Sequence, residues 1–231
     1  MLDDDPGFLF DPEALAKQGL ITGRAAGRGE AWFFSYQGHD LVLRHFRRGG
    51  LIGKFLDDQY LGWNPESSRS WREWRLLHRL YDLGLPVPRP VAADVQLGRG
   101  FYRADLITCR IPGAATLADR LASEPLAPEV WMRIGMTIAL FHRQGVHHAD
   151  LNASNILLSG EGKIFLIDFD RGVMRPPGGW KRGNLDRLLR SLRKFGKRTR
   201  PFHFSEPDWA TLLSGYGRPS MEPASVEARI L

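Results

Sequence analysis

The sequence predicts an α+β protein, because strand-like segments come first in the chain and helical segments dominate later. Short apolar runs separated by turn residues fill residues 19–46, a pattern that is typical of strands. The second half carries longer stretches with apolar residues at helical spacing. With 231 residues, of which 43% are hydrophobic, the chain is long enough for one domain that can be built as two lobes.

The order of elements begins with an acidic lead-in, residues 1–18, whose Pro6 and Pro12 favour an irregular or briefly helical path. At the other end of the chain, we expect residues 219–231 to form a loosely held tail. The first long helix of the chain, at 70–83, is expected to end at Gly84. The elements expected between lead-in and tail are strands at 20–21, 32–34 and 41–43, a basic insert at 47–66, a helix at 70–83, strands at 91–96 and 101–108, helices at 116–122 and 128–144, strands at 156–158 and 163–167, and a helix at 185–195.

Composition narrows the classes of partner and compartment. The 32 basic and 26 acidic side chains give a net charge of +6, which favours an anionic partner. The single cysteine, Cys109, cannot form an internal disulfide. The acidic N-terminus does not resemble a signal peptide, and no apolar run is long enough to cross a bilayer. We therefore expect a cytoplasmic protein that can still lie on a membrane surface.

One segment carries the pattern of a phosphoryl-transfer site. Asp150 is followed five residues later by Asn155 and, after thirteen more, by Asp168 at the end of an apolar run. This spacing resembles the catalytic loop H-x-D-L-x-x-x-N and the D-F-G element of the protein-kinase superfamily. On that logic Asp150 orients the acceptor hydroxyl and takes up its proton, and Asn155 and Asp168 bind Mg²⁺ through oxygen ligands. His148 braces the loop.

A transition-metal hydrolase is the alternative for the same segment. His147, His148 and Asp150 are residue types that ligate such metals. The surrounding elements favour the kinase interpretation, because a helix precedes the loop, a hairpin follows it, and Asp168 stands at a strand end.

The first half of the chain supplies candidates for the nucleotide-binding side chains. Gly27, Arg28 and Gly29 resemble a reduced glycine-rich loop that lets backbone approach phosphate, although a plain hairpin turn fits them too. Arg44 stands where the superfamily usually has a lysine for the α- and β-phosphates, and Lys54 is a possible substitute.

The partner expected for this cation is Glu73 on the following helix. Glu73 also fits a capping box with Ser70, which would fix it at a helix start instead. The segment from Thr108 to Ile111 corresponds to the hinge whose backbone holds adenine.

Two departures from the protein-kinase pattern indicate a small acceptor. Ala149 replaces the arginine that many regulated protein kinases pair with a phosphorylated activation loop, and Asp170 replaces the glycine of D-F-G. No Ala-Pro-Glu element follows Asp168. We therefore expect neither a protein acceptor nor control by phosphorylation.

Five motifs together resemble the bacterial 3-deoxy-D-manno-octulosonic acid (Kdo) kinases, over roughly residues 20–200. They are RHFRRGGLIGK at 44–54, GLPVPRP at 84–90, YRADLIT at 102–108, HADLN at 148–152 and IDFDR at 167–171. The resemblance implies transfer of the ATP γ-phosphate to the Kdo 4-hydroxyl of a lipid A precursor, with Mg²⁺, at the cytoplasmic face of the inner membrane. The lipopolysaccharide heptose kinases are the alternative within this group.

The resemblance also implies a protein-kinase-like two-lobed fold. We expect a mostly antiparallel sheet in an N-lobe at residues 19–108 and a reduced helical C-lobe at residues 109–218. It implies a glycolipid acceptor and a peripheral position on the membrane, with no nucleic acid or protein partner.

The predicted helix at 185–195 has two interpretations. Leu185, Leu188 and Leu192 belong to an apolar stripe, beside a basic run that extends to Arg198. Such a helix can lie on an acidic membrane or face lipid phosphates, or it can pack its stripe into the core and leave a solvated basic face.

Two classes of binding protein also remain open. One is an inactive kinase fold, and the retention of Asp150, Asn155 and Asp168 argues against it. The other is a nucleic-acid-binding module, but the basic run offers only Phe195 for stacking on bases.

Overall fold

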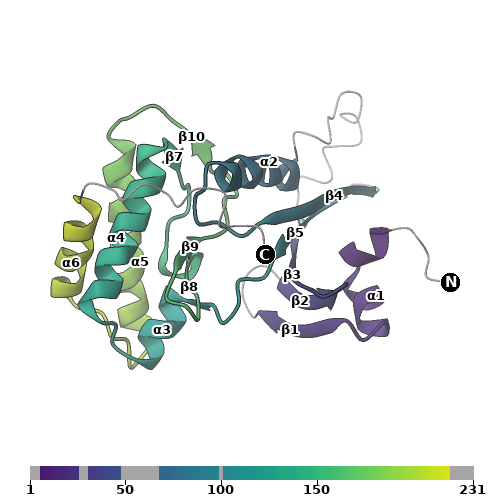
Figure 1. Ribbon diagram of the computed structural model, residues 1–231, viewed down its shortest axis with the longest axis horizontal. Coiled ribbons are helices and arrows are strands. Elements are labelled where there is room, and N and C mark those ends of the chain that lie inside the picture. The colour runs from purple at the N-terminus through teal and green to yellow at the C-terminus, as the bar shows by residue number, and fades with distance from the viewer. Residues whose placement is uncertain (1–5, 26–30, 48–67, 99–100, 219–231) are drawn as a thin grey trace. The chain divides into compact units, whose positions relative to one another are not determined.

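The computed structural model describes residues 6–25, 31–47, 68–98 and 101–218. The chain divides into two compact units: unit 1 comprises Met1–His78 and Arg89–Arg110, and unit 2 comprises Arg79–Pro88 and Ile111–Leu231. Strands predominate in unit 1 and helices in unit 2 (Figure 1). The predicted α+β class is confirmed.

Unit 1 is built on an antiparallel five-stranded sheet in the order β1-β2-β3-β5-β4. Phe34 lies opposite Leu41, and Val42 lies opposite Thr108 on the next strand. The helix α2 starts in unit 1, and its last turn belongs to unit 2. The elements are η1 Pro6–Phe10, α1 Pro12–Lys17, β1 Ile21–Ala25, β2 Ala31–Tyr36, β3 His39–Arg47, α2 Arg69–Asp82, β4 Pro90–Gly98 and β5 Phe101–Cys109.

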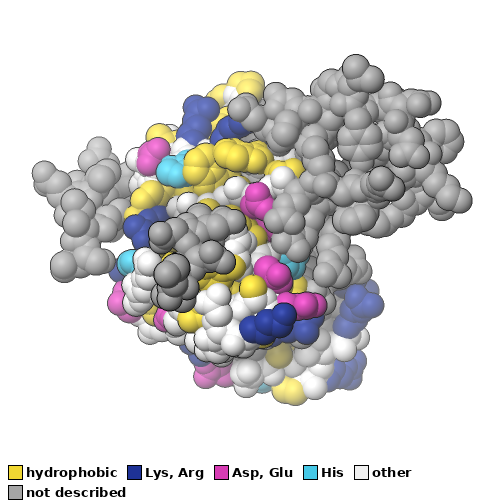
Figure 2. Space-filling model, turned by 90° about the vertical axis from the view of Figure 1, so that its right-hand side faces the viewer, with side chains coloured by type: hydrophobic (Ala, Val, Ile, Leu, Met, Phe, Trp, Pro, Cys, Tyr) yellow, Lys and Arg dark blue, Asp and Glu magenta, His cyan; other side chains and the backbone are white. Residues whose placement is uncertain are grey.

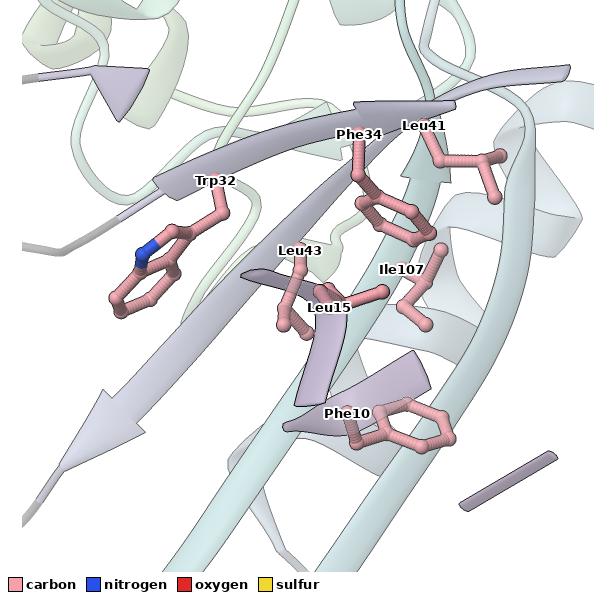
Figure 3. Packing of buried hydrophobic residues seen from close by; sticks show 7 residues of the cluster. All are labelled: Phe10, Leu15, Trp32, Phe34, Leu41, Leu43 and Ile107. Carbon is pink, nitrogen blue, oxygen red and sulfur yellow. The ribbon is translucent and has the colours of Figure 1, made fainter. Parts of the chain in front are cut away.

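The lead-in segment covers one face of this sheet. Side chains two residues apart on a strand point to the same face, and the buried residues of β2 and β3 follow this spacing. Phe10 and Leu15 pack against that face (Figure 3). Asp11 caps α1 by accepting a hydrogen bond from the backbone N–H of Glu13. The cluster comprises Phe10, Leu15, Trp32, Phe34, Leu41, Leu43 and Ile107.

Unit 2 combines four helices among its described residues with short strands. A three-stranded antiparallel sheet has the order β6-β8-β9, and β7 pairs with β10. The elements are β6 Ala115–Thr116, α3 Leu117–Ser123, α4 Pro128–Arg143, β7 Val146–His147, η4 Ala153–Asn155, β8 Ile156–Leu158, β9 Ile164–Leu166, β10 Val173–Met174, α5 Trp180–Arg198 and α6 Glu206–Tyr216.

The helices α4 and α6 pack at backbone contact, which requires glycine on both sides. A Cβ atom on Gly135 would lie 2.0 Å from the carbonyl oxygen of Leu212, and one on Gly215 would lie 2.1 Å from that of Met132. Such separations are far below any van der Waals contact, so no other residue fits at either position. The elements expected from the sequence end with the helix at 185–195 and therefore miss α6, although Ser205 and Asp208 form a capping box at its start.

The helix α5 is longer than the predicted 185–195, since it begins at Trp180 and ends at Arg198. The apolar stripe faces the interior, with Leu185, Leu188 and Leu192 all buried. The core-packing interpretation of the stripe is therefore correct, and the basic side chains of the helix remain at the surface.

Candidate active site

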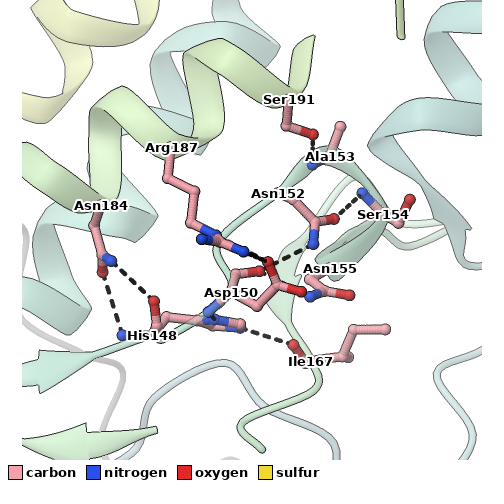
Figure 4. A network of polar contacts seen from close by, with 10 residues as sticks. All are labelled: His148, Asp150, Asn152, Ala153, Ser154, Asn155, Ile167, Asn184, Arg187 and Ser191. Atoms are coloured by element: carbon pink, nitrogen blue, oxygen red, sulfur yellow. Dashed lines mark hydrogen bonds and ion pairs between the residues drawn. The ribbon is translucent and has the colours of Figure 1, made fainter. Parts of the chain in front are cut away.

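The predicted catalytic loop follows β7 and is fixed from within by His148. The buried ring donates from Nε2 to the carbonyl oxygen of Ile167 at 2.9 Å, and its Nδ1 accepts from the backbone N–H of Asp150 at 3.2 Å (Figure 4). Because a backbone N–H can only donate, Nδ1 carries no proton and the ring is the neutral Nε2–H tautomer. His148 thus ties the loop to the segment that leads to Asp168.

Burial lowers the pKa of His148, against the opposing effects of its hydrogen bond to Ile167 and of the carboxylates of Asp168 and Asp150. Both carboxylates therefore lie within electrostatic reach of one imidazole. Within the described residues no group of three or more His, Cys, Asp or Glu side chains is arranged to hold a metal. Both ring nitrogens of His148 are already engaged by backbone, which disfavours its use as a transition-metal ligand.

Backbone and side-chain hydrogen bonds bring the three predicted oxygen-bearing residues together in unit 2. Asn155 donates from Nδ2 to the carbonyl oxygen of Asp150 at 2.9 Å, and its own carbonyl accepts from the N–H of Ile167 at 3.0 Å. Asp168 follows directly, in the left-handed region with φ of 64°, an uncommon backbone conformation that Asp and Asn tolerate better than most residues. The loop and the strand end thus converge on one place.

The carboxylate of Asp150 has a partner that sequence reasoning did not identify. Arg187 on α5 donates to Asp150 Oδ1 from Nε at 2.9 Å and also from Nη2, so that both hydrogen bonds end on the same oxygen. Burial raises the pKa of Asp150, but hydrogen bonding and positive charge from Arg187 outweigh it, and the pKa lies below its ordinary value. Asp150 is therefore held in its ionised form.

Two further residues of α5 hold the same loop, and Figure 4 shows them on the side of the helix that carries Arg187. Asn184 accepts from the N–H of His148 at 3.2 Å and donates to its carbonyl oxygen at 2.9 Å. Ser191 accepts from the N–H of Ala153 at 3.2 Å. Asn184, Arg187 and Ser191 are three and four residues apart, which places them on one face of the helix. This polar spacing beside the leucine stripe is visible in the sequence and could have indicated the contact with the loop.

A buried chain of hydrogen bonds continues from Asn184 to α6. His142 donates from Nε2 to Asn184 Oδ1 at 3.3 Å, and its Nδ1 accepts from the hydroxyl of Tyr216 at 2.9 Å. Burial lowers the pKa of His142 to about 4, although the hydrogen bond to Asn184 acts in the opposite direction. The imidazole is therefore neutral near pH 7, and because Nε2 carries its proton, Nδ1 is the acceptor for the Tyr216 hydroxyl.

In unit 1 the predicted cation and its predicted partner are in contact. Arg44 on β3 donates from Nη1 to Glu73 Oε1 at 2.8 Å, and the Glu73 side chain is fully buried. The helix α2 begins at Arg69, and Ser70 donates to the carbonyl oxygen of Asp94 at 3.4 Å. Ser70 is thus inside the helix rather than at its cap, and Glu73 serves Arg44 instead of a capping box.

The remaining nucleotide-side candidates are distributed as follows. Thr108 is buried on β5 in unit 1. Ile111 lies in unit 2 and lines a cavity of about 360 Å³ together with Gly113 and Phe165. Gly27, Arg28 and Gly29 lie outside the described residues, as does Lys54.

Comparisons with known proteins identify the family. A model described as the lipopolysaccharide kinase (Kdo/WaaP) family matches residues 13–216. The chain is 42% identical over 208 residues to the 3-deoxy-D-manno-octulosonic acid kinase of Vibrio vulnificus (strain CMCP6), covering 90% of this chain and 88% of that one. It is 45% identical over 215 residues to the enzyme of the same name in Mannheimia succiniciproducens, covering 90% and 89%, and 45% identical over 210 residues to that in Stenotrophomonas maltophilia, covering 90% and 83%. The chain therefore belongs to the lipopolysaccharide kinase (Kdo/WaaP) family and is a phosphotransferase.

Proposed function

We propose that the protein transfers the γ-phosphate of ATP to the 4-hydroxyl of Kdo on a Kdo-lipid A precursor. Its relatives are named 3-deoxy-D-manno-octulosonic acid kinases, which supports this acceptor. The observation that carries the proposal is the convergence of Asp150, Asn155 and the Ile167–Asp168 strand end around His148. Phosphoryl transfer depends mainly on positioning and charge stabilisation, and a loop fixed by backbone hydrogen bonds suits that need.

Asp150 is the proposed base. Its ionised carboxylate uses Oδ1 for Arg187, and we assign Oδ2 to the acceptor hydroxyl. In this role the carboxylate orients the attacking oxygen and takes up its proton as the oxygen bonds to the γ-phosphorus and the bond from that phosphorus to the bridging oxygen breaks, so that ADP leaves. A well-placed base contributes roughly 10²–10⁴-fold to the rate. His148 acts through Asp150 by fixing its backbone N–H.

Asn155 and Asp168 fit a magnesium site. The Nδ2 atom of Asn155 is engaged by the carbonyl oxygen of Asp150, which leaves Oδ1 as the end that can meet a cation. An amide oxygen and a carboxylate are hard ligands of the kind that Mg²⁺ prefers. When bound there, Mg²⁺ would neutralise charge on the nucleotide phosphates.

The proposed nucleotide contacts come mainly from unit 1. Arg44 is the candidate for the α- and β-phosphates, and buried Glu73 fixes the direction of its guanidinium. We retain Gly27, Arg28 and Gly29 as the proposed phosphate loop. Thr108 and Ile111 are the proposed ends of the adenine-binding hinge.

A phosphate-transfer assay tests the acceptor. The protein is incubated with Mg²⁺, γ-labelled ATP and one of two lipid acceptors: a Kdo-lipid A precursor without heptose, or one extended with heptose. Label that appears on the heptose-free acceptor, at the Kdo 4-hydroxyl, supports the proposal. Label only on heptose would instead favour a heptose kinase, and folded protein that labels neither acceptor would contradict kinase action on this glycolipid.

The proposed acceptor also implies contact with an acidic membrane surface. Within the described part of the chain, no helix combines the length and apolar character that crossing a bilayer requires. On the face drawn in Figure 2, basic side chains of the described residues are interspersed with acidic and hydrophobic ones. The second half of α5 carries exposed basic residues, among them Arg190, Lys194, Lys197 and Arg198.

Each basic side chain near an anionic membrane contributes about 1 kcal/mol of attraction. Co-sedimentation with vesicles containing phosphatidylglycerol should therefore exceed that with pure phosphatidylcholine and should fall with added salt. Replacing those four residues by glutamine should abolish the difference between the two vesicle types. Equal sedimentation of this variant and the wild type would assign membrane contact to another surface.

A further inference from the structure

One face of α5 contacts the catalytic loop at three points, of which two are on the loop backbone and one is on a side chain. Asn184 is buried and bonds to both backbone polar groups of His148. Ser191 bonds to the backbone N–H of Ala153. Arg187, between them on the same face, contacts a side chain, the carboxylate of Asp150, and no hydrogen bond from its guanidinium to the loop backbone is present among the described residues.

The contact of Arg187 with Asp150 is open to solvent. The two side chains are 47% and 49% exposed, whereas Glu73 in the ion pair of unit 1 is 0% exposed. Ion pairs between exposed side chains contribute only about 0–1 kcal/mol to stability. Since Asn184 and Ser191 already fix the backbone of the loop, Arg187 is not needed to hold it.

The guanidinium also has donors to spare. Arginine carries five N–H groups in a planar fork, and the contact with Asp150 uses Nε and Nη2 on a single oxygen. Such a fork suits a planar carboxylate. A second anion beside Asp150 can therefore share the same guanidinium without removing the first.

We propose that Arg187 binds the carboxylate of the acceptor sugar while Asp150 faces its hydroxyl, so that Arg187 determines specificity for an acidic sugar. This inference rests on the proposed function. In a 3-deoxy-2-ulosonic acid the carboxylate is attached to C2 and the reacting hydroxyl to C4, with only the C3 methylene between those carbons. The two functional groups are thus close neighbours on the sugar, as Arg187 and Asp150 are on the protein.

The arrangement gives two functions to one ion pair. Without acceptor, Arg187 pairs with the carboxylate of Asp150. With acceptor bound, its remaining N–H groups meet the carboxylate, and this contact fixes which hydroxyl of the sugar lies at Asp150. A neutral sugar of similar shape would leave those donors without an anionic partner, so it would bind more weakly and in less defined orientation.

The test combines a substitution in the protein with a chemical change in the acceptor. Wild-type protein and Arg187→Gln are each assayed with the Kdo-lipid A precursor and with an analogue whose Kdo carboxylate is reduced to a hydroxymethyl group. A hydrogen-bonded contact between charged groups predicts that wild-type kcat/KM falls about tenfold or more with the reduced acceptor. Arg187→Gln should treat both acceptors alike, with an unchanged KM for ATP. Arg187→Lys, which keeps the charge without the fork, should recover part of the preference.

A matched control is Arg182→Gln, which removes an exposed arginine from the same helix and should keep the wild-type preference. If Arg187→Gln keeps the wild-type ratio of kcat/KM between the two acceptors, whether or not kcat falls by the same factor with both, the carboxylate contact is wrong and Arg187 acts on Asp150 or on the phosphoryl group. If the wild type phosphorylates neither acceptor, the proposed function itself fails and this inference fails with it. Circular dichroism of each variant verifies that the fold is retained.

Discussion

The side-chain amide of Asn184 bonds to both the N–H and the carbonyl oxygen of His148, at 3.2 and 2.9 Å. A residue of α5 thus replaces the strand partner that the backbone of His148 would otherwise need. Its Oδ1 also accepts from His142, which extends the connection to Tyr216 on α6. The position of Asp150 therefore depends on helices that lie far along the chain from it.

The proposed base can be tested by Asp150→Asn. The amide keeps the size of the side chain but cannot take up the proton of the acceptor, so we expect kcat to fall by roughly a hundredfold or more. ATP binding, measured by calorimetry, should stay near the wild-type value. The matched control is Asp186→Asn on the exposed side of α5, which should leave kcat unchanged. Near-normal turnover by Asp150→Asn would show that another group is the base.

The proposed magnesium ligand Asp168 is best tested with a residue that tolerates its backbone conformation. Asp168 has a φ of 64°, and asparagine tolerates this region better than alanine does. We expect Asp168→Asn to lower kcat/KM by roughly a hundredfold or more, because a carboxylate ligand of the metal is lost. ATP affinity, titrated with and without Mg²⁺, should lose most of its dependence on the metal. An unaltered dependence would place the ligand elsewhere.

The ion pair of unit 1 should contribute to stability as well as to nucleotide binding. Arg44→Ala leaves the fully buried carboxylate of Glu73 without this cation, and we expect the free energy of unfolding in urea to fall by about 2 kcal/mol or more. Arg44→Lys keeps a positive charge and should lose less. Arg72→Ala, an exposed position on α2, should stay within about 0.5 kcal/mol of wild type. A loss for Arg44→Ala no larger than for Arg72→Ala would mean that the pair is not maintained.

Stability should depend on pH through His142. The folded protein holds this imidazole neutral, with a pKa lowered to about 4 by burial, whereas the ordinary pKa of histidine is 6.5. Below pH 6.5 the imidazole of His142 is protonated in the unfolded chain, whereas it stays neutral in the folded protein down to about pH 4. The free energy of unfolding should therefore fall between pH 6.5 and about 4, by up to roughly 3 kcal/mol from this residue, and be unaffected by it above that range.

The matching measurement is urea unfolding at several pH values for wild type and His142→Gln. His142→Gln should show a shallower decline between pH 6.5 and 4.5 than wild type. Parallel declines for wild type and His142→Gln would show that the loss of stability arises at other groups.

Backbone contact between α4 and α6 can be tested at its glycines. A Cβ on Gly215 would lie 2.1 Å from the carbonyl oxygen of Met132, so Gly215→Ala must push the helices apart, at a cost of about 2 kcal/mol or more. Gly183 on α5 has nothing within 4 Å of an added Cβ. Gly183→Ala should therefore stabilise the protein by about 0.5–1 kcal/mol, because alanine favours a helix over glycine. Thermal unfolding should show a lower melting temperature for Gly215→Ala and a higher one for Gly183→Ala. The packing argument would be refuted if Gly183→Ala destabilised the protein and Gly215→Ala did not.

The helices at the end of the chain show where sequence reasoning failed. The apolar periodicity around Leu185, Leu188 and Leu192 predicted the centre of α5 but not its start at Trp180. The helix α6 escaped prediction although Trp209 and Leu212 are buried on it at helical spacing. Gly215, the third buried position of that face, packs through its backbone against α4 and adds no apolar side chain to the pattern.

The sequence by itself determined the family, the α+β class and the spacing of Asp150, Asn155 and Asp168. These three lie within one loop and the hairpin that follows, so they are near one another along the chain, and the hydrogen bonds of His148 and Asn155 to Ile167 complete their convergence. Only the tertiary structure decided that Arg187 contacts Asp150 and that Asn184 holds His148. Those contacts join residues 36 and 37 positions apart, and their formation depends on the packing of the leucine stripe of α5, which fixes the rotation of the helix and hence which polar side chains reach the loop.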